Sequence, residues 1–598
     1  MIKILARKRS SFFSEGASRD RLFVILHGWT YDAGRMQSIA DLVRERDTSG
    51  DIFVPTMPIN CVYCREDGAS LARQLLEEIE CLDSARREAG APYREIILIG
   101  HSSGAVLCRA IWALAVGGQP GGTVDHDGAS VVADRIVRMV LIAAVARGWT
   151  DTMPVSVSVR LLLWFGMVNE VLFGERFFVF DLRRGSPFLT TMRLQTLAVL
   201  HSRLRTPPLT IQLLGTNDDL VAPGDDIDVT TGESFIYCEM RDTGHFNANE
   251  VGGDDPVSAE RRRLCASAIF DDEASLRRVG LSASAVGEIA QSAVEESFGG
   301  EDAEAAEITS PRAAEQAAES VQNVTLVVHG IRDFGFWTKK LAIRIRGYAA
   351  RRGTVCRTLT PSYGFLPMGP FLIPTVRRRY ACWLMDHYVT VRAAFPQARE
   401  ICFIGHSNGT YLLAKALKDC RAIHFDRVIF AGSVVRHDYP WENVLRGTGT
   451  GQIGRLVNYV ATDDWVVASV PRALQRMGLA NLGDAGHSGF RPNPNIVEAR
   501  YVPGDHSAAI REENWEEMAA FVVDGIDPPS IAPSPRRAHD HGTIGKRTAY
   551  LGLFGSALLA SVFLLPLGLL ASFGIPDALW VLVVLGIFWG MGRVLTQI

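Results

Sequence analysis

Gly100-His101-Ser102-Ser103-Gly104 and Gly405-His406-Ser407-Asn408-Gly409 are two copies of one pattern, Gly-x-Ser-x-Gly, in a chain of 598 residues. Each copy directly follows an apolar run, at residues 96–99 or 401–404, and directly precedes a helical pattern. One such pentapeptide arises easily by chance, but two in the same strand-to-helix context do not. The pattern predicts a strained turn, because bulk in place of either glycine would clash with neighbouring backbone.

A second repeated feature precedes each pentapeptide. The apolar run 22–26 ends in His27-Gly28, and the run 324–328 ends in His329-Gly330. The distance from this histidine to the serine of the pentapeptide is 75 residues in the first half and 78 in the second. Self-similarity over such a length predicts two domains of the same fold.

The remaining apolar runs indicate the fold class. β-Branched runs that alternate with helical patterns are typical of a mostly parallel sheet covered on both faces. Later strands are predicted at residues 136–143, 209–214, 427–432 and 456–461, and the helices after the pentapeptides at 105–115 and 410–418. The expected fold class is α/β, with two such domains.

These features resemble the α/β-hydrolase family, whose nucleophilic serine, acid and histidine follow one another along the chain in that order. A serine hydroxyl needs an adjacent base, and the base needs an acid that fixes its tautomer. In the first half the resemblance implies Ser102 as nucleophile, Asp218 as acid and His245 as base. Asp219 is the alternative acid.

In the second half the resemblance implies Ser407 as nucleophile, Asp464 as acid and His506 as base. Asp463 is the alternative acid, and Ala461 stands where the first half has a glycine. His487 precedes the last predicted strand, at residues 496–502, and is the weaker candidate for the base.

The family also stabilises the oxyanion with two backbone N–H groups, one after the nucleophile and one after the His-Gly strand. By position these are the amides of Ser103 and Trp29 in the first half, and of Asn408 and Ile331 in the second. His27 and His329 are expected to brace their loops and not to take part in the reaction.

The first half carries an insertion between nucleophile and acid. The two residues are 116 positions apart in the first half and 57 apart in the second. The extra segment, about residues 148–202, is apolar and lies where the family has a cap over the active site. A cap of this kind would line a hydrophobic pocket, although packing on the core is the equal alternative. A Pro-broken apolar stretch at residues 363–374 could dip toward lipid or form a second pocket wall, and packing under the neighbouring helix is the equal alternative.

Composition shifts divide the chain. We expect a first hydrolase-like domain at residues 1–275, an Ala/Glu-rich linker at 276–320 and a second domain at 321–526. A Pro-rich linker at 527–547 then leads to two apolar runs at 548–595, predicted to be a C-terminal two-helix transmembrane hairpin. Basic residues flank the hairpin and only Asp577 lies in its turn, so both ends are expected on the cytoplasmic side.

The bulk composition excludes some functions. The formal charge of −4 and the scattered arginine runs argue against nucleic acid as a partner. Ten scattered cysteines and the lack of an apolar signal segment in residues 1–10 suit a reducing compartment. No cofactor or metal is implied, and the oligomeric state is not predicted.

The resemblance therefore implies a membrane-tethered serine hydrolase that acts through an acyl-enzyme on lipid or fatty-acyl esters. The alternative is a membrane-bound interaction or effector protein that uses one or both folds to bind a ligand or partner without catalysis. Fold analogy alone does not decide between the two.

Overall fold

A computed structural model describes residues 12–17, 20–61, 63–150, 163–167, 169–170, 177–218, 220, 228, 234–280, 320–446, 449–464, 466–468, 481–491 and 498–529. The chain divides into two compact units. One comprises Met1–Ser297, Cys382–Pro396 and Cys420–Ile423, and the other comprises Phe298–Ala381, Gln397–Asp419 and His424–Ile598. Each unit holds one sheet and is described by itself.

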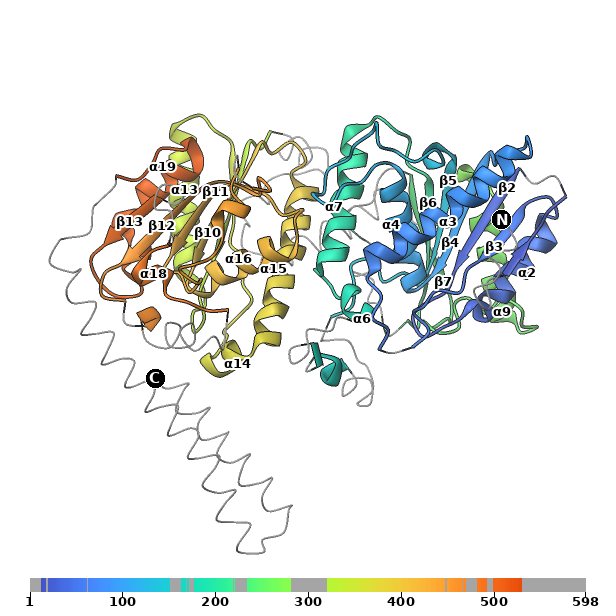
Figure 1. The fold of residues 1–598 in the computed structure, drawn as a ribbon, viewed down its shortest axis with the longest axis horizontal. Coiled ribbons are helices and arrows are strands. Elements are labelled where there is room, and N and C mark those ends of the chain that lie inside the picture. The colour runs from blue at the N-terminus through green and yellow to red at the C-terminus, as the bar shows by residue number, and fades with distance from the viewer. Residues whose placement is uncertain are drawn as a thin grey trace, which may run out of the picture. The chain divides into compact units, whose positions relative to one another are not determined.

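The first unit is built on a seven-stranded sheet in the order β1-β3-β2-β4-β5-β6-β7 (Figure 1). Its strands are parallel except β1, which runs antiparallel to β3. The strands are β1 Phe12–Ser14, β2 Arg21–Leu26, β3 Asp51–Val54, β4 Glu95–His101, β5 Ile136–Ile142, β6 Leu209–Gly215 and β7 Phe235–Met240. The described helices are α2 Gln37–Arg46, α3 Gly68–Glu88, α4 Ser103–Ala115, α6 Phe178–Asp181, α7 Pro187–Ser202, α9 Pro256–Phe270 and α10 Glu273–Val279.

Alternate residues of β2 face two different cores, because successive side chains of a strand point to opposite faces. Leu22, Val24 and Leu26 pack in the core that α3, α4 and α7 cover. Phe23 and Ile25 pack in the core beneath α2 and α9 on the other face. Burial of each such side chain contributes about 2 kcal/mol, and an uninterrupted apolar strand is what a sheet covered on both faces requires.

The second unit repeats this arrangement with a six-stranded, fully parallel sheet in the order β13-β12-β11-β10-β8-β9. Read from the other edge, this order matches that of β3 to β7 in the first unit. The strands are β8 Asn323–Val328, β9 Cys356–Leu359, β10 Glu400–His406, β11 Phe425–Ala431, β12 Ile453–Ala461 and β13 Glu498–Val502. The described helices are α13 Phe336–Arg351, α14 Met368–Leu372, α16 Asn408–Asp419, α18 Ala485–Ser488 and α19 Trp515–Asp524. Helix α15 Pro374–Ala394 is divided between the two units at Cys382.

The α/β class and the parallel sheets agree with the sequence analysis, and the strands lie within a few residues of the predicted runs. The antiparallel edge strand β1 was not predicted. Among the described residues no helix is both long enough and apolar enough to cross a membrane. The predicted hairpin at residues 548–595, most of both linkers and residues 151–162, 168 and 171–176 of the predicted cap lie outside the described residues.

Candidate active site

Ser102 occupies a sharp turn between β4 and α4. Its backbone has φ 53° and ψ −118°, a conformation that residues other than glycine rarely adopt. The serine stands at the N-cap of α4, yet its side chain makes no capping hydrogen bond. A serine in this position ordinarily caps the helix, so the turn instead leaves its hydroxyl available for another partner.

The two glycines of the pentapeptide are required by close backbone approach. A Cβ on Gly100 would lie 2.5 Å from the backbone N of Ala105, and one on Gly104 would lie 2.5 Å from the carbonyl oxygen of Leu26. Both positions therefore need glycine for the turn to form. This packing also brings Ser102 against the end of β2.

The hydroxyl of Ser102 meets the predicted histidine and acid. Its Oγ lies 2.9 Å from Nε2 of His245, and Nδ1 of His245 lies 2.9 Å from Oδ2 of Asp218. His245 follows β7 and Asp218 follows β6, so loops at the carboxyl ends of parallel strands bring the three residues together. The Asp218 carboxylate is fully buried and also accepts the N–H of Leu220 at 3.0 Å. Asp219 lies outside the described residues.

His101 holds the histidine loop from behind. Its Nε2 lies 2.9 Å from the carbonyl oxygen of His245, so Nε2–H donates to that carbonyl. Burial lowers the pKa of His101 to about 3, with the neighbouring His245 adding to the effect. The His101 ring therefore stays neutral and serves as a fixed donor.

Of the two predicted oxyanion amides, that of Ser103 begins α4, and that of Trp29 follows Gly28, where an added Cβ would lie 3.2 Å from Cβ of Ser102. The next amide along, that of Thr30, donates to the carbonyl of Ile59 at 2.8 Å, and Thr30 has a positive φ of 66°. His27 bridges the same loop, since its Nε2 accepts the N–H of Met57 at 2.9 Å and its Nδ1 lies 2.9 Å from the carbonyl oxygen of Gly28. His27 thus has the geometry of a brace.

An apolar cluster lies beside Trp29. It consists of Phe177, Val179 and Phe180, against which Trp29 packs together with Trp149, Leu163 and Met167. Leu163 and Met167 belong to the predicted cap, of which residues 151–162, 168 and 171–176 lie outside the described residues. The described part of the insertion therefore contacts the loop that carries a predicted oxyanion amide.

The second unit contains a similar arrangement. Ser407 has a φ of 51°, and Nδ1 of His506 lies 2.7 Å from Oδ2 of Asp464, whose side chain is fully buried. Asp464, and not the exposed Asp463, is thus the acid that contacts His506. His487 is buried in α18, and the structure does not bring it to the Asp464 carboxylate.

The second arrangement is less tightly bonded than the first. No hydrogen bond joins Ser407 to His506 among the described residues, and His406 Nε2 lies 3.3 Å from the carbonyl oxygen of His506. The side-chain amide of Asn408 donates to the Tyr363 hydroxyl at 3.1 Å, and that hydroxyl donates to the carbonyl of His329 at 2.9 Å. Tyr363 thus links the two segments that carry the predicted oxyanion amides of this half.

The contacts of His101, His406 and Tyr363 were missed in the sequence analysis. A signal existed for the first two, because the same His-Ser pair stands in both pentapeptides. The role of Tyr363 had no local signal, since it depends on a loop that folds back onto His329.

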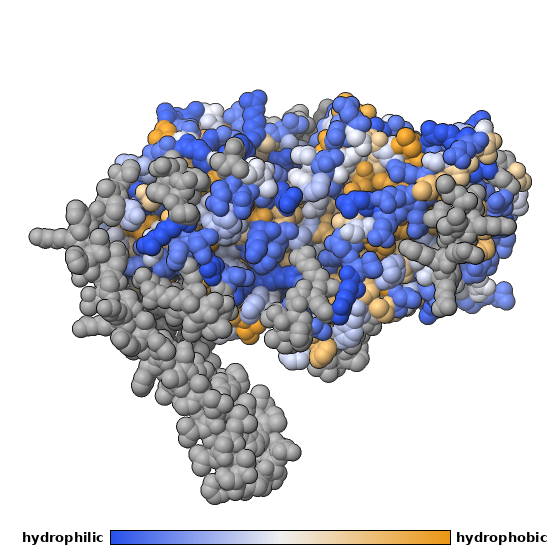
Figure 2. Space-filling view, viewed as in Figure 1, coloured by the Kyte–Doolittle hydropathy of each residue, from blue (hydrophilic) through white to orange (hydrophobic). Residues whose placement is uncertain are grey.

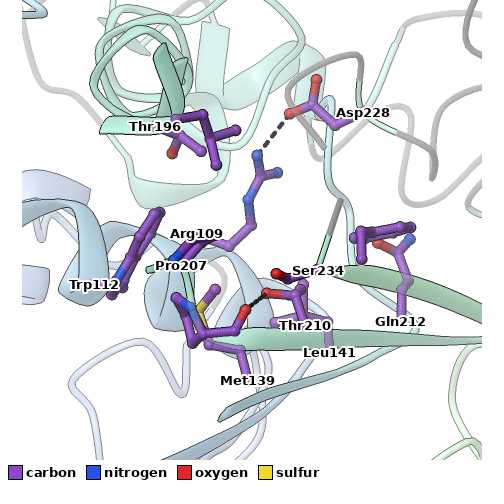
Figure 3. A pocket seen from close by; sticks show the side chains of 13 residues that line it. Arg109, Trp112, Met139, Leu141, Thr196, Pro207, Thr210, Gln212, Asp228 and Ser234 are labelled. Atoms are coloured by element: carbon purple, nitrogen blue, oxygen red, sulfur yellow. Dashed lines mark hydrogen bonds and ion pairs between the residues drawn. The ribbon is translucent and has the colours of Figure 1, made fainter. Parts of the chain in front are cut away.

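A separate pocket lies between α4, α7 and the sheet of the first unit (Figure 3). Its lining includes Arg109, Thr210, Gln212 and Asp228, and none of Ser102, Asp218 or His245. Arg109 points at Asp228, and their side chains are 2.8 Å apart at Nη2 and Oδ2. These two charged groups neutralise each other. Within the described residues no group of three His, Cys, Asp or Glu side chains could hold a metal ion.

Together the sheet order, the strained serine turn and the loop positions define an α/β-hydrolase domain in the first unit. In agreement, residues 23–256 match the family model described as the alpha/beta hydrolase family. Among curated protein sequences, none matches this chain.

Several solved structures are similar to part of the chain. A monoacylglycerol lipase from Paleococcus ferrophilus is 14% identical over 43% of this chain and 97% of its own, with a TM-score of 0.27. A carboxylesterase from Bacillus subtilis is 11% identical over 44% and 88%, with a TM-score of 0.26. Esterase B from Lactobacillus rhamnosis is 10% identical over 47% and 82%, with a TM-score of 0.30.

Proposed function

We propose that this chain is a serine hydrolase of carboxylic esters whose main catalytic residues are Ser102, His245 and Asp218. The observation that carries the proposal is the continuous chain of two 2.9 Å contacts from the Ser102 hydroxyl through the imidazole to a buried carboxylate. A serine in a strained turn with a base in contact is the arrangement that acyl transfer requires.

The reaction follows from these contacts. Oγ of Ser102 attacks the ester carbonyl carbon as its proton passes to Nε2 of His245, and Asp218 stabilises the imidazolium through Nδ1–H. The amides of Trp29 and Ser103 stabilise the oxyanion. The tetrahedral intermediate then collapses and the ester C–O bond breaks, so that the alcohol leaves with the proton from His245. Water, deprotonated by the same imidazole, then releases the acid and restores Ser102.

The substrates we propose are lipid or fatty-acyl esters. Support comes from the apolar cluster of Phe177, Val179 and Phe180 beside Trp29, which offers an apolar chain a place next to the reacting carbonyl. The two apolar runs at residues 548–592 further suggest a chain tethered to a membrane, with the hydrolase domains on the cytoplasmic side.

For the second unit we propose a slower site built on Ser407, His506 and Asp464, with the amides of Ile331 and Asn408 as oxyanion donors. The 2.7 Å contact between His506 and Asp464 favours activity. The contrary candidate is a unit that binds a ligand without catalysis, and the missing Ser407–His506 hydrogen bond among the described residues is the observation that favours it.

Fluorophosphonate labelling of the full chain tests both sites, because only an activated serine reacts at a useful rate. We expect peptide mapping to find the adduct on Ser102 and, more slowly, on Ser407. Ser102→Ala should abolish the faster phase and lower ester hydrolysis by at least about a thousandfold. Ser84→Ala, at an exposed position of α3, is the matched control. Unchanged labelling and hydrolysis in Ser102→Ala would refute the assignment.

A further inference from the structure

Three phenylalanines of the second unit are held out into solvent. Phe334, Phe336 and Phe365 expose 61%, 70% and 44% of their surface. The Phe334 ring contacts both of the others, with its centroid 6.2 Å from that of Phe336 and 5.4 Å from that of Phe365. We call these three residues the aromatic rim. On the face shown in Figure 2 hydrophilic residues predominate, so a cluster of exposed rings calls for an explanation.

Hydrogen bonds hold the backbone on both sides of the aromatic rim, which keeps the three rings exposed. The Asp333 carboxylate accepts the N–H of Gly335 at 2.8 Å and the indole N–H of Trp337 at 2.7 Å. The carbonyl of Leu366, next to Phe365, accepts the N–H of Arg332 at 3.0 Å. Both loops are therefore tied down by polar contacts while their phenylalanines remain outside the core.

The surroundings of the aromatic rim are strongly basic. Residues 331–380 contain eleven lysines and arginines and a single acidic residue, Asp333, which the contacts above already engage. Three of these arginines, Arg344, Arg351 and Arg352, pair with acidic side chains at residues 512–524. Arg332, Lys339 and Lys340 are exposed and lie within a few residues of the phenylalanines.

Exposed aromatic rings beside lysines and arginines match the chemistry of an anionic bilayer surface. The rings insert at the headgroup boundary, and the cations pair with lipid phosphates. Phe336, Lys340 and Ile343 share one face of α13 by their spacing, and Ile343 is also 62% exposed. This face extends the apolar and basic character away from the loops.

We propose that the aromatic rim and its flanking cations dock the second unit onto an anionic phospholipid membrane. The rim starts four residues after Gly330, where an added Cβ would lie 2.8 Å from Cβ of Ser407. Docking brings the loop beside Ser407 to the lipid surface, so that a substrate can enter from the bilayer. That last consequence rests on the proposed function, whereas the docking itself does not.

Hydrogen exchange on the full chain tests the docking. The protein is placed in phosphatidylcholine nanodiscs with and without phosphatidylglycerol, and peptides covering residues 331–343 and 361–373 are followed. We expect slower exchange in both peptides when phosphatidylglycerol is present. Phe334→Ser, Phe336→Ser and Phe365→Ser combined should abolish this protection, and peptides of β8 and β10 report whether the unit stays folded.

The control is a triple variant at exposed apolar residues of the first unit, Val131→Ser, Leu204→Ser and Val279→Ser, which should keep the protection. Arg332→Gln and Lys340→Gln should each weaken the interaction with anionic lipid by about fivefold. Arg73→Gln, an exposed cation elsewhere, should not.

Two results would overturn the proposal. The first is hydrogen exchange in the two peptides that is the same with and without phosphatidylglycerol. If Ser102 is still labelled by fluorophosphonate in that case, the docking is refuted and the proposed hydrolase is not. The other is protection that rises with protein concentration without lipid, because a second copy of the chain would then cover the aromatic rim. If labelling fails while lipid protection persists, the docking stands and the proposed hydrolase does not.

Discussion

At the scale of single residues, the turns at Ser102 and Ser407 each contain a second residue, a histidine, that packs beneath the neighbouring histidine loop. His101 and His406 are both buried, and burial lowers the pKa of each to about 3. Each ring approaches the backbone carbonyl of the base in its own site, at 2.9 Å for His101 and 3.3 Å for His406. The histidine that contacts the His245 or His506 loop should thus also make the fold sensitive to acid.

Acidification should destabilise the first unit through His101. In the unfolded chain this histidine binds a proton near its ordinary pKa of 6.5, but in the folded chain only near 3. This titration therefore leaves the free energy of unfolding unchanged above about pH 6.5. As the pH falls below that value the free energy of unfolding decreases, by about 2 kcal/mol at about pH 5. Urea midpoints measured at about pH 7.5 and about pH 5 supply the test.

The variant His101→Gln separates this titration from other acid effects. Glutamine keeps an N–H that can reach the His245 carbonyl, but it does not titrate. The decrease in the free energy of unfolding between about pH 7.5 and about pH 5 should therefore be smaller by about 2 kcal/mol in the variant. Fluorophosphonate labelling of Ser102 should persist in this variant because the donor is retained. An equal acid loss in wild type and variant would show that His101 does not carry the effect.

At the scale of elements, residues of the first cap segment meet the apolar cluster beside Trp29. Leu163 and Met167 are half-buried against Phe177, Val179 and Phe180. If these side chains bind an acyl chain, their removal affects long substrates more than short ones, because only a long chain reaches them.

We expect Leu163→Ala with Met167→Ala to lower kcat/KM for long-chain esters by about tenfold and to spare acetate esters. A profile of hydrolysis against chain length measures this. Leu204→Ala, at an exposed site away from the cluster, is the control and should leave the profile unchanged. Equal losses on acetate and long-chain esters would mean that the segment packs as core.

Much of the element order could be predicted from the sequence because buried parallel strands carry continuous apolar runs. The run at residues 136–143 became β5, and that at 209–214 became β6. The three-residue β1 lies among polar residues and has no such run. It forms a strand because its backbone pairs with β3, and a sequence pattern does not show that pairing. The prediction of Asp464 as the partner of His506 followed from its position just after a strand. The hydrogen bond from the Tyr363 hydroxyl to the carbonyl of His329 depends on tertiary folding and had no such signal.

At the scale of the whole molecule, two units built on parallel sheets are followed along the sequence by two apolar runs at residues 548–592. The sequence turns polar and Pro-rich after α19, with prolines at 528, 529, 533 and 535, and residues 548–573 then carry no charge. A segment of that length and composition is long enough to cross a bilayer as a helix. The described residues end at Pro529, in the polar stretch that precedes this segment.

A chain that ends at Asp540 should therefore stay soluble and keep its ester hydrolysis, while the full chain should need detergent. The cut falls in the polar linker and exposes none of the buried residues of α19, such as Phe521 and Val522. Sedimentation with and without membranes, together with hydrolysis of a dispersed ester, provides the measurement. The full chain with Ser102→Ala serves as the inactive control.

A reporter fused after Ile598 should remain on the cytoplasmic side, since basic residues at 536, 537, 546, 547 and 593 flank the two runs and only Asp577 lies between them. If the shortened chain still requires detergent, or the reporter lies on the far side, the hairpin is not what tethers this protein.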